Sequence, residues 1–398
     1  MRLISREIFW PAAAPGVNTY GDSFYVRPTG VAKMCRRAVE TKNDLVDVVE
    51  YGFSDDNGAT WSALRPTTVF ETFPDGSTLR RWVLPSFVDP VNGRLLTLYN
   101  EAVMPHDDAL LDGMTNTFLK YRVSLDGGHT DVVDETIIQR GYTPERPLRG
   151  VVVGKNAVML GDNGCEPIRT RGGRLLVPVQ VCPLGPDGTY ANPGGGYSYH
   201  EAAVLIGQWR EDARFDWELS PYICNDPEAS TRGAVEPTIA QFPDGRILMV
   251  LRGSNDAKPH LPGYRWYTVS HDEGDSWAPV RPWTYDTGEA FFSPSSMSQL
   301  LTHSSGAYYW LGNISPTNPS GNAPRYPLYL GRVDPGSLRL VKDSLCEIDT
   351  RRPGEHEAMT LSNFHAHEDR VTGDILLHMG RWLTNGPEDW TADALLYR

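Results

Sequence analysis

The 398-residue sequence predicts an all-β fold, and three observations support this prediction. Short apolar runs of about five or six residues follow Gly-containing turns throughout the chain, as in successive antiparallel strands. No long stretch has the 3.6-residue apolar period that is typical of an amphipathic helix. An octet of the form Ser-x-Asp-x-Gly-x-x-Trp occurs at residues 54–61 (SDDNGATW) and again at residues 270–277 (SHDEGDSW).

The expected strands share one plan, in which a turn with glycine and a polar residue precede the apolar run. They lie in FPDGSTLRRWVL (73–84), DPVNGRLLTLYNE (89–101), RGGRLLVPVQV (171–181), FPDGRILMVLRG (242–253) and RVTGDILLHMGRW (370–382). An Asp-Gly or Asn-Gly pair between extended runs is a strong hairpin signal. We therefore expect antiparallel sheets built from hairpins.

The octets have degenerate relatives at SLDGGHTD (124–131), RFDW (214–217) and GRVDPGSL (331–338). Their positions fit a repeat of roughly 60–70 residues, each with about four strands, which describes a β-propeller. We expect six blades, or seven if some are short, in one domain over residues 1–398. The last run, DALLYR (393–398), is expected to complete a blade that begins near the N-terminus.

The octet itself is interpreted as a structural turn. In the first copy, Asp56 is suited to accept backbone N–H groups of its own turn, Gly58 supplies a positive φ, and Trp61 can pack against the sheet. The second copy offers the same residue types. We therefore assign no chemistry to these turns, because a repeated fold explains a repeated turn.

The net charge of −13, from 37 basic and 50 acidic residues, argues against a nucleic-acid partner and against an anionic membrane surface. A few converging arginines still allow an anionic small ligand. The 11 Trp and 18 Tyr are typical of aromatic-rich β proteins and carbohydrate-binding surfaces.

The first 16 residues contain no apolar signal-peptide core, and no apolar run reaches the roughly 18 residues of a membrane span. The sequence predicts a cytoplasmic protein if Met1 is native, and a secreted one if a leader has been removed. The five cysteines show no CxxC spacing, so free buried thiols are expected, including Cys165.

The octets resemble the Asp-box, the bacterial neuraminidase repeat of the sialidase superfamily, and the chain resembles that superfamily over nearly its whole length. The resemblance implies a six-bladed propeller in which three arginines bind the sugar carboxylate and a Glu activates a Tyr nucleophile. Residues 232–253 (RGAVEPTIAQFPDGRILMVLRG) are similar to the segment with that Glu and the second arginine, which assigns these roles to Glu236 and Arg252.

The other two arginines follow from similar segments. Residues 315–334 (SPTNPSGNAPRYPLYLGRVD) resemble the segment of the third arginine and assign it to Arg325, whereas FYVRPTG (24–30) offers Arg27 as the first. The chain departs from the family at TLSNFHAHEDRVTGDILLH (360–378), where Leu361 occupies the position of the nucleophilic Tyr. A leucine side chain cannot attack an anomeric carbon. The possible substitutes are Tyr264, Tyr267 and Tyr326.

The same fold and Asp-boxes occur in enzymes that cleave rhamnose–glucuronate linkages, including lyases, and in ulvan lyases, where histidine and arginine carry the chemistry. A lyase needs a cation at the uronate carboxylate, a base for the C5 proton and an acid for the leaving oxygen. The resemblance offers Arg232, Arg252 and Arg325 as cations, and His106, His200 and His365 as proton carriers.

Each of these residues also has a structural interpretation. The arginines are equally suited to salt bridges between blades, His106 to a solvated loop, and His365 to packing between blades. Glu236 at a strand entry and His200 after the glycine-rich NPGGGYSYH (192–200) are expected at a pocket rim. We rank His106 and His200, together with Glu236, as the candidate catalytic residues.

Metal and cofactor motifs are absent from the sequence. HEAMT and HEAAV lack the second His of HExxH, and no EF-hand loop, Gly-x-Ser-x-Gly elbow or phosphate-binding Gly loop occurs. No cofactor is expected to be required, and nothing requires a calcium ion in a central channel.

The sequence therefore predicts a carbohydrate-active enzyme whose partner is an oligosaccharide or polysaccharide with a carboxylate sugar. We expect exo-type cleavage at a uronic-acid linkage, with a lyase mechanism. The alternatives are an exo-sialidase-type hydrolase and a non-catalytic glycan-binding propeller.

Overall fold

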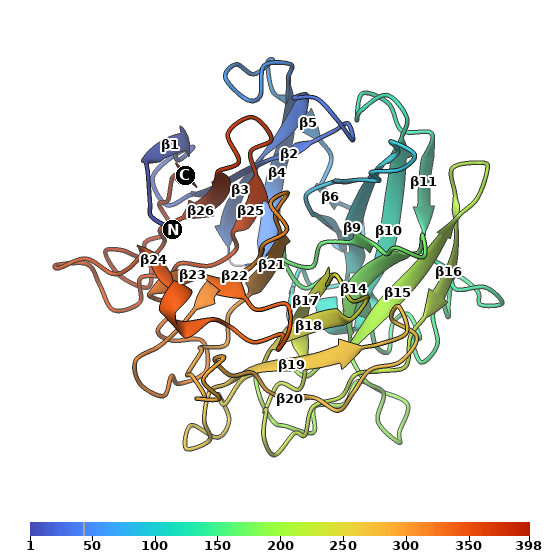
Figure 1. Cartoon of the computed structure of the whole chain (residues 1–398). Coiled ribbons are helices and arrows are strands. Elements are labelled where there is room, and N and C mark those ends of the chain that lie inside the picture. The colour runs from blue at the N-terminus through green and yellow to red at the C-terminus, as the bar shows by residue number, and fades with distance from the viewer. Residues whose placement is uncertain (43) are drawn as a thin grey trace.

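The computed structural model describes residues 1–42 and 44–398. In these residues the strands form six antiparallel sheets, which are arranged around a common centre in Figure 1. Strands β17, β21 and β25 lie towards that centre, and β11, β16 and β20 lie at the outside. The chain is thus a six-bladed β-propeller, as the repeat spacing predicted.

The first three blades are formed by consecutive strands. The first contains β2 (Asn18–Tyr25), β3 (Lys33–Lys42), β4 (Leu45–Ser54) and β5 (Arg65–Thr67). The second contains β6 (Phe70–Thr72), β7 (Thr78–Val83), β8 (Phe87–Val88), β9 (Leu95–Met104), β10 (Thr117–Ser124) and β11 (Val133–Thr136). The third contains β12 (Val158–Met159), β13 (Ile168–Arg169), β14 (Leu175–Val181), β15 (Glu201–Trp209) and β16 (Phe215–Leu219).

The remaining three blades have four strands each. The fourth contains β17 (Val235–Gln241), β18 (Ile247–Arg252), β19 (Arg265–Ser270) and β20 (Arg281–Pro282). The fifth contains β21 (Ser298–Thr302), β22 (Tyr308–Asn313), β23 (Leu328–Val333) and β24 (Cys346–Asp349). The sixth contains β25 (His365–Glu368), β26 (Ile375–Gly380), β27 (Ala394–Tyr397) and β1 (Arg6–Trp10). The short helices are α1 (Gly113–Asn116) and the 3₁₀ turn η1 (Lys342–Ser344).

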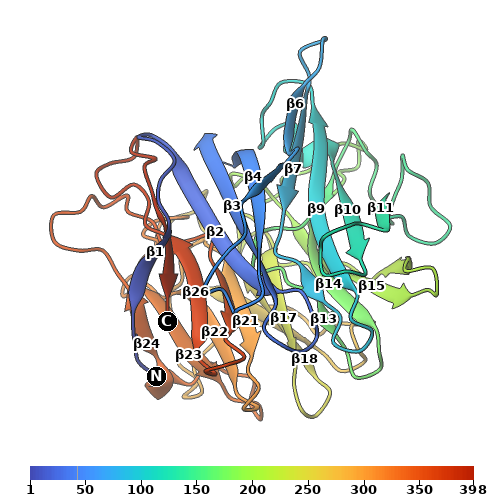
Figure 2. The same cartoon turned by 90° about the horizontal axis from the view of Figure 1, so that it is seen from above.

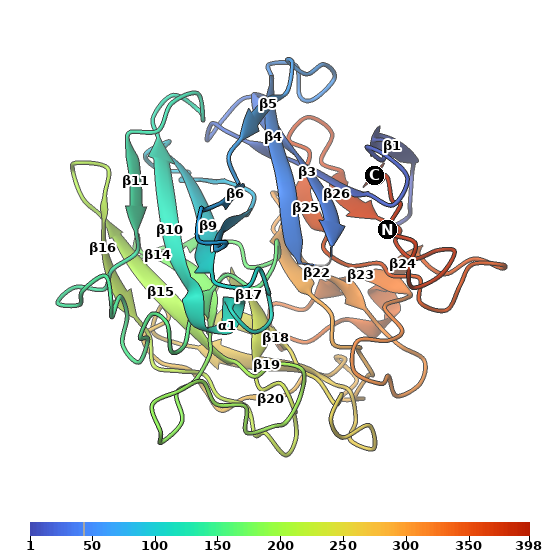
Figure 3. The same ribbon diagram turned by 180° about the vertical axis from the view of Figure 1, so that it is seen from behind.

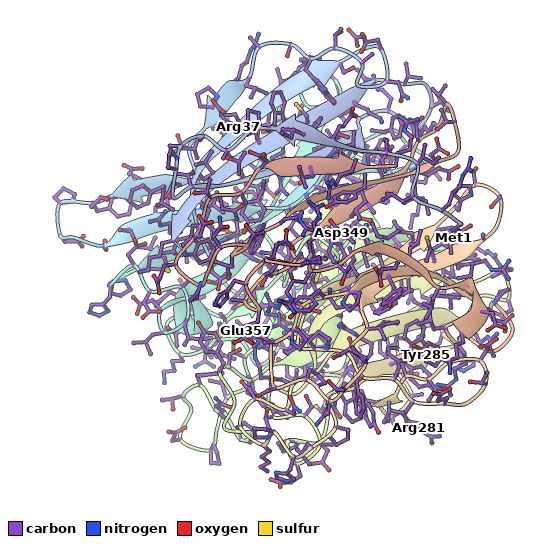
Figure 4. The ribbon with its side chains drawn as sticks, turned by 90° about the vertical axis from the view of Figure 1, so that its left-hand side faces the viewer. Met1, Arg37, Arg281, Tyr285, Asp349 and Glu357 are labelled. Atoms are coloured by element: carbon purple, nitrogen blue, oxygen red, sulfur yellow. The ribbon has the colours of Figure 1, made fainter. Side chains whose placement is uncertain are left out.

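The sixth blade joins the two ends of the chain. Strand β27 pairs antiparallel with β1, which confirms the prediction for residues 393–398. The N- and C-termini accordingly lie close together in Figures 1 and 2. Asp349, labelled in Figure 4, ties this blade to the fifth, because it pairs with Arg381 and accepts the Tyr397 hydroxyl at 2.6 Å.

The octets form turns between the third and fourth strands of their blades. In the first copy the Asp56 carboxylate accepts the Thr60 backbone N–H at 2.8 Å and the Thr60 hydroxyl at 2.6 Å. Gly58 has a φ of +87° and donates its N–H to the Ser54 hydroxyl at 2.8 Å. The same pattern recurs at Asp126 and Asp272, so the Asp-box turns of the predicted fold are confirmed.

The hydrophobic core lies between neighbouring blades. Buried side chains of β9 and β10 pack against those of β14 and β15, and similar clusters join the third blade to the fourth, the fourth to the fifth and the fifth to the sixth. Burying these apolar faces fixes each blade against the next, which leaves the loops at the blade ends to form a site.

One hairpin stands outside this regular plan. The β6–β7 hairpin projects beyond the blades in Figure 2. Among the described residues, neither helix has the length or apolar character needed to cross a membrane. The five cysteines are free, as expected, and Cys35, Cys165 and Cys182 are buried, but Cys224 is exposed and Cys346 is partly exposed.

Candidate active site

A cavity of about 490 Å³ lies among the blade ends. It is bordered by the β3–β4 turn, by α1 and by the start of β17, and Figure 3 shows α1 and β17 near the middle of the face turned to the viewer. The polar side chains that line it come from distant parts of the sequence. They are Tyr20, Arg36, Glu40, Asp44, Asn100, Thr117, Asp162, Asn163, Gln180, Tyr197, Ser198, His200, Arg232, Glu236, Arg252, Asn322, Arg325 and Asn363.

Arg252 and Arg325 both line this cavity, and both donate to Ser295. The Arg252 Nε donates to the Ser295 hydroxyl at 2.9 Å, and an Arg325 Nη donates to the Ser295 carbonyl oxygen at 3.1 Å. Burial lowers the pKa of Arg325 to about 10, and the nearby Arg252 charge adds to this shift. Two cations held this close favour an anion between them.

Arg232 brings a third guanidinium to the same cavity. It is buried, and it donates to the Ser198 hydroxyl. Burial, followed by the charge of Arg252, lowers the pKa of Arg232 to about 10. Its hydrogen-bond acceptor in the described chain is a neutral hydroxyl, and its buried Nε has no partner there.

Glu236 enters the cavity from an irregular point of the fourth blade. The β17–β18 register shifts between Val235 and Thr238, and Glu236 has a φ of +45°, which is uncommon for a residue other than glycine. Its carboxylate forms an ion pair with Arg252. A Cβ at Gly161 would lie 2.6 Å from the Glu236 Cγ, so this approach requires glycine.

Asp162 follows this glycine and carries a second carboxyl group. Burial raises the pKa of Asp162 to about 8, and the Glu236 charge adds to the effect. Asp162 therefore keeps its proton at neutral pH, whereas the Glu236 carboxylate is paired with Arg252. Such a difference is what a general acid and base require.

Asp44 reaches the cavity from the β3–β4 turn. It has a φ of +61°, and its carbonyl oxygen accepts the Trp82 indole N–H at 2.7 Å. Burial raises the pKa of Asp44, and the charges of Arg325 and Arg252 oppose that shift. Asp44 thus faces the arginines from the first blade.

The first blade also contributes a Tyr–Glu pair. The Tyr20 hydroxyl donates to Glu40 Oε2 at 2.6 Å, and the Leu45 backbone N–H donates to Glu40 Oε1 at 3.1 Å. Burial raises the pKa of Glu40 to about 7. Because Leu45 follows Asp44, Glu40 also holds the turn that presents Asp44.

The candidate histidines are distributed differently from the sequence prediction. His200 lines the cavity and is buried, and its burial, with the charge of Arg232, lowers its pKa to about 3. The side chain of His106 is 76% exposed and lies outside the cavity lining. His365 is buried outside the lining and pairs with Glu166 through Nε2 at 2.6 Å. Of the three candidate histidines, His200 therefore lies with the arginines, whereas His106 and His365 do not line the cavity.

Arg27 also lies away from this cluster. It is exposed and donates to the Leu125 carbonyl oxygen at 3.2 Å, in the turn of residues 124–131, so the assignment of Arg27 to an arginine triad does not fit the structure. Leu361 is fully buried in the core between the fifth and sixth blades. Tyr264, Tyr267 and Tyr326 do not line the cavity either.

Sequence reasoning missed Tyr20, Glu40, Asp44, Asp162 and Tyr197, all of which line the cavity. Each stands alone in a turn or strand, without a motif. Their one shared signal is an ionisable or aromatic side chain next to a blade end. In residues 1–42 and 44–398, no group of three His, Cys, Asp or Glu side chains is arranged to hold a metal ion.

Comparisons with known proteins place this geometry in a family. A profile described as a BNR repeat-like domain matches residues 86–339. A protein of unknown function from Dyadobacter fermentans has 13% identity and a TM-score of 0.62, with 100% of this chain and 98% of that chain covered. A search of curated proteins finds no match.

Two enzymes have similar structures. The intramolecular trans-sialidase from Ruminococcus gnavus has 13% identity and a TM-score of 0.59, with 100% of this chain and 97% of that chain covered. The GH93 α-L-arabinofuranosidase of Fusarium graminearum has 14% identity and a TM-score of 0.57, with 99% and 97% covered. These findings confirm the resemblance to the sialidase superfamily, and they give no support to the rhamnose–glucuronate branch.

Proposed function

We propose that this chain, which belongs to the BNR repeat-like domain family, is a glycoside hydrolase that removes a terminal acidic sugar from an oligosaccharide or polysaccharide. The observation that carries the proposal is that Arg232, Arg252 and Arg325 line one cavity together with the carboxyl groups of Asp162 and Glu236. The likeness to two glycan-processing enzymes supports the broader assignment to carbohydrate chemistry.

The arginines supply the recognition of the acidic sugar. Arg325 and Arg232 donate to neutral oxygen atoms, which leaves their positive charge available to a ligand carboxylate. A guanidinium binds a carboxylate through two parallel N–H···O bonds, each worth about 1.5–3 kcal/mol. A neutral sugar offers no charge to these buried cations, so the cavity favours uronate or sialate units.

The carboxyl groups supply the proton transfers. In this proposal the protonated Asp162 donates its proton to the glycosidic oxygen as the bond to the anomeric carbon breaks. Glu236 then accepts a proton from the water that attacks that carbon, and hydrolysis is complete when the two protons are redistributed through solvent. Arg252 holds the Glu236 carboxylate in place throughout.

A uronate lyase is the second candidate, and Glu40 is the observation that favours it. A lyase base must remove the C5 proton near neutral pH, and the pKa of Glu40 of about 7 suits this task better than His200, whose pKa is about 3. The arginines would then stabilise the carbanion through the uronate carboxylate.

A panel of acidic glycans distinguishes these candidates. Sialyllactose, oligoglucuronate and oligogalacturonate are incubated with the protein, and reducing ends and ultraviolet absorbance are followed. Hydrolysis releases a reducing sugar without absorbance, whereas elimination yields an absorbing unsaturated uronate. Binding without either signal identifies a glycan-binding propeller, and binding of neutral glycans in preference to all acidic ones contradicts the proposal.

A further inference from the structure

Tyr197 presents an exposed aromatic side chain at the edge of the cavity. It lines the cavity, yet it is 55% exposed, which makes it one of the most exposed large side chains of the described chain. Burial raises the pKa of its hydroxyl. The charges of Asp44 and Asp108 add to this shift, whereas the charge of Arg232 opposes it. Tyr197 therefore combines a place in the cavity lining with a ring that solvent can reach.

The loop that carries Tyr197 is fixed closely against the protein. A Cβ at Gly194 would lie 2.2 Å from the Thr231 carbonyl oxygen, and a Cβ at Gly196 would lie 2.6 Å from an Asp256 carboxylate oxygen. The Tyr197 backbone N–H donates to the same Asp256 carboxylate at 2.7 Å. The glycines thus allow a contact that holds the loop, and the exposure of Tyr197 does not result from a loosely attached segment.

The Tyr197 ring is also oriented by a residue of the site. The Arg232 guanidinium lies over this ring at 5.4 Å from its centroid, in a cation–π contact. The lining of the cavity also includes the apolar side chains of Ala109, Leu110 and Met114. A carboxylate held by the arginines does not need these apolar side chains, whereas the apolar face of a pyranose ring does.

We propose that Tyr197 is the stacking platform for the sugar unit that follows the terminal acidic sugar, on the leaving-group side of the cleaved bond. This inference rests on the proposed function and defines the substrate as a disaccharide or longer. The arginines hold the terminal carboxylate inside the cavity, and the chain of the glycan leaves across the exposed ring. An aromatic face in a ligand site binds an apolar surface with defined geometry.

Isothermal titration with matched ligands tests this platform. The probes are methyl glucuronoside with glucuronosyl-galactose, and methyl sialoside with sialyllactose, so that each pair differs in its second sugar. The variants are Tyr197→Ala, Tyr197→Leu and Tyr197→Phe. Tyr142→Ala is the control, because Tyr142 is 38% exposed and does not line the cavity.

We expect wild-type protein and Tyr197→Phe to bind the longer member of one pair about threefold to tenfold more tightly than the shorter member. Tyr197→Ala and Tyr197→Leu should lose that difference and keep their affinity for the methyl glycoside. An equal loss of affinity for the shorter and the longer ligand overturns the platform. An unchanged difference between their affinities in Tyr197→Leu overturns it as well. Failure of the wild-type protein to bind any of the four ligands overturns the arginine pocket and this inference with it.

Discussion

Asp56 and Asp162 are chemically identical side chains in opposite surroundings. Asp56 lies in an exposed Asp-box turn, where hydrogen bonds from the Thr60 hydroxyl and backbone N–H lower its pKa to about 2. Asp162 lies in the central cavity, where burial and the charge of Glu236 raise its pKa to about 8. The hydrogen bonds around Asp56 stabilise its charged form and the turn, whereas burial of Asp162 outweighs its hydrogen bond from the Asn163 N–H and favours the protonated form.

The largest expected effect separates these two groups. Asp162→Asn removes the acidic proton with little change of shape, so kcat should fall by about 10²–10⁴-fold. Steady-state kinetics on the best glycan of the panel measure this change. Asp56→Asn is the matched control and should leave kcat within about twofold while lowering the melting temperature. Equal losses of kcat in both variants would contradict the division of roles.

The second effect concerns recognition by the arginines. Arg325→Met keeps much of the volume and removes the charge, so KM for the acidic substrate should rise by about 10–100-fold, in line with one charge-assisted contact. The methyl ester of the same substrate should respond much less. Arg27→Met, which changes an exposed arginine outside the cavity, is the control. A similar response to acid and ester would show that Arg325 acts on the fold.

The pH dependence should follow the raised pKa of Asp162. A general acid works while it is protonated, so kcat should be retained at neutral pH and fall as pH rises through about 8, by about tenfold per unit above it. The same raised pKa makes the folded state hold a proton that the unfolded chain releases near pH 4, so this group reduces stability as pH rises from about 4 to 8. Kinetics and thermal melting over this range measure both. An alkaline limb that persists in the residual activity of Asp162→Asn would assign it to another group.

A smaller effect is expected in the turns. Asp272→Ala removes the acceptors of the Ser276 N–H at 2.9 Å and of the Ser270 hydroxyl at 2.8 Å. The free energy of unfolding should fall by about 1–2 kcal/mol, with kcat per folded molecule unchanged. Denaturant titration gives this value. A loss of turnover at unchanged stability would indicate that the Asp-box takes part in catalysis.

The smallest effect is expected at His106. Its side chain is 76% exposed and lies outside the cavity, so His106→Ala should change kcat and KM by less than about twofold. His200→Ala is the informative comparison, because His200 lines the cavity beside Arg232. A loss of about 100-fold in His106→Ala would restore the histidine hypothesis and require the loop to move towards the arginines.

The fold was readable from the sequence because each blade repeats a local pattern. Alternating turns and apolar runs predicted the strands, and the octets marked the third turn of a blade without any long-range information. The resemblance also selected Glu236, Arg252 and Arg325, and all three line one cavity, although their roles remain predictions.

The rest of the site could not be read in this way because it depends on distant contacts. Asp162 and Glu40 become unusual only when other blades bury them, and neither lies in a recognisable motif. The role of the first arginine was wrongly assigned to Arg27 for a related reason. Its local sequence resembles a family motif, but the chain passes through β2 before reaching it, so the side chain emerges beside an outer turn.

The pairing of β1 with β27 has a consequence for how the ring assembles. The pairing of Arg6 in β1 with Tyr397 in β27 brings together the two ends of the chain. This contact therefore closes a very long loop and carries a large entropic cost. Contacts of such high sequence separation slow folding, whereas the hairpins within each blade form from neighbouring residues. Until the last strand arrives, the sixth blade has an open hydrogen-bonding edge that is prone to pair with other chains. The β1–β27 pairing that closes the ring therefore makes its assembly slow and dependent on the residues of β27.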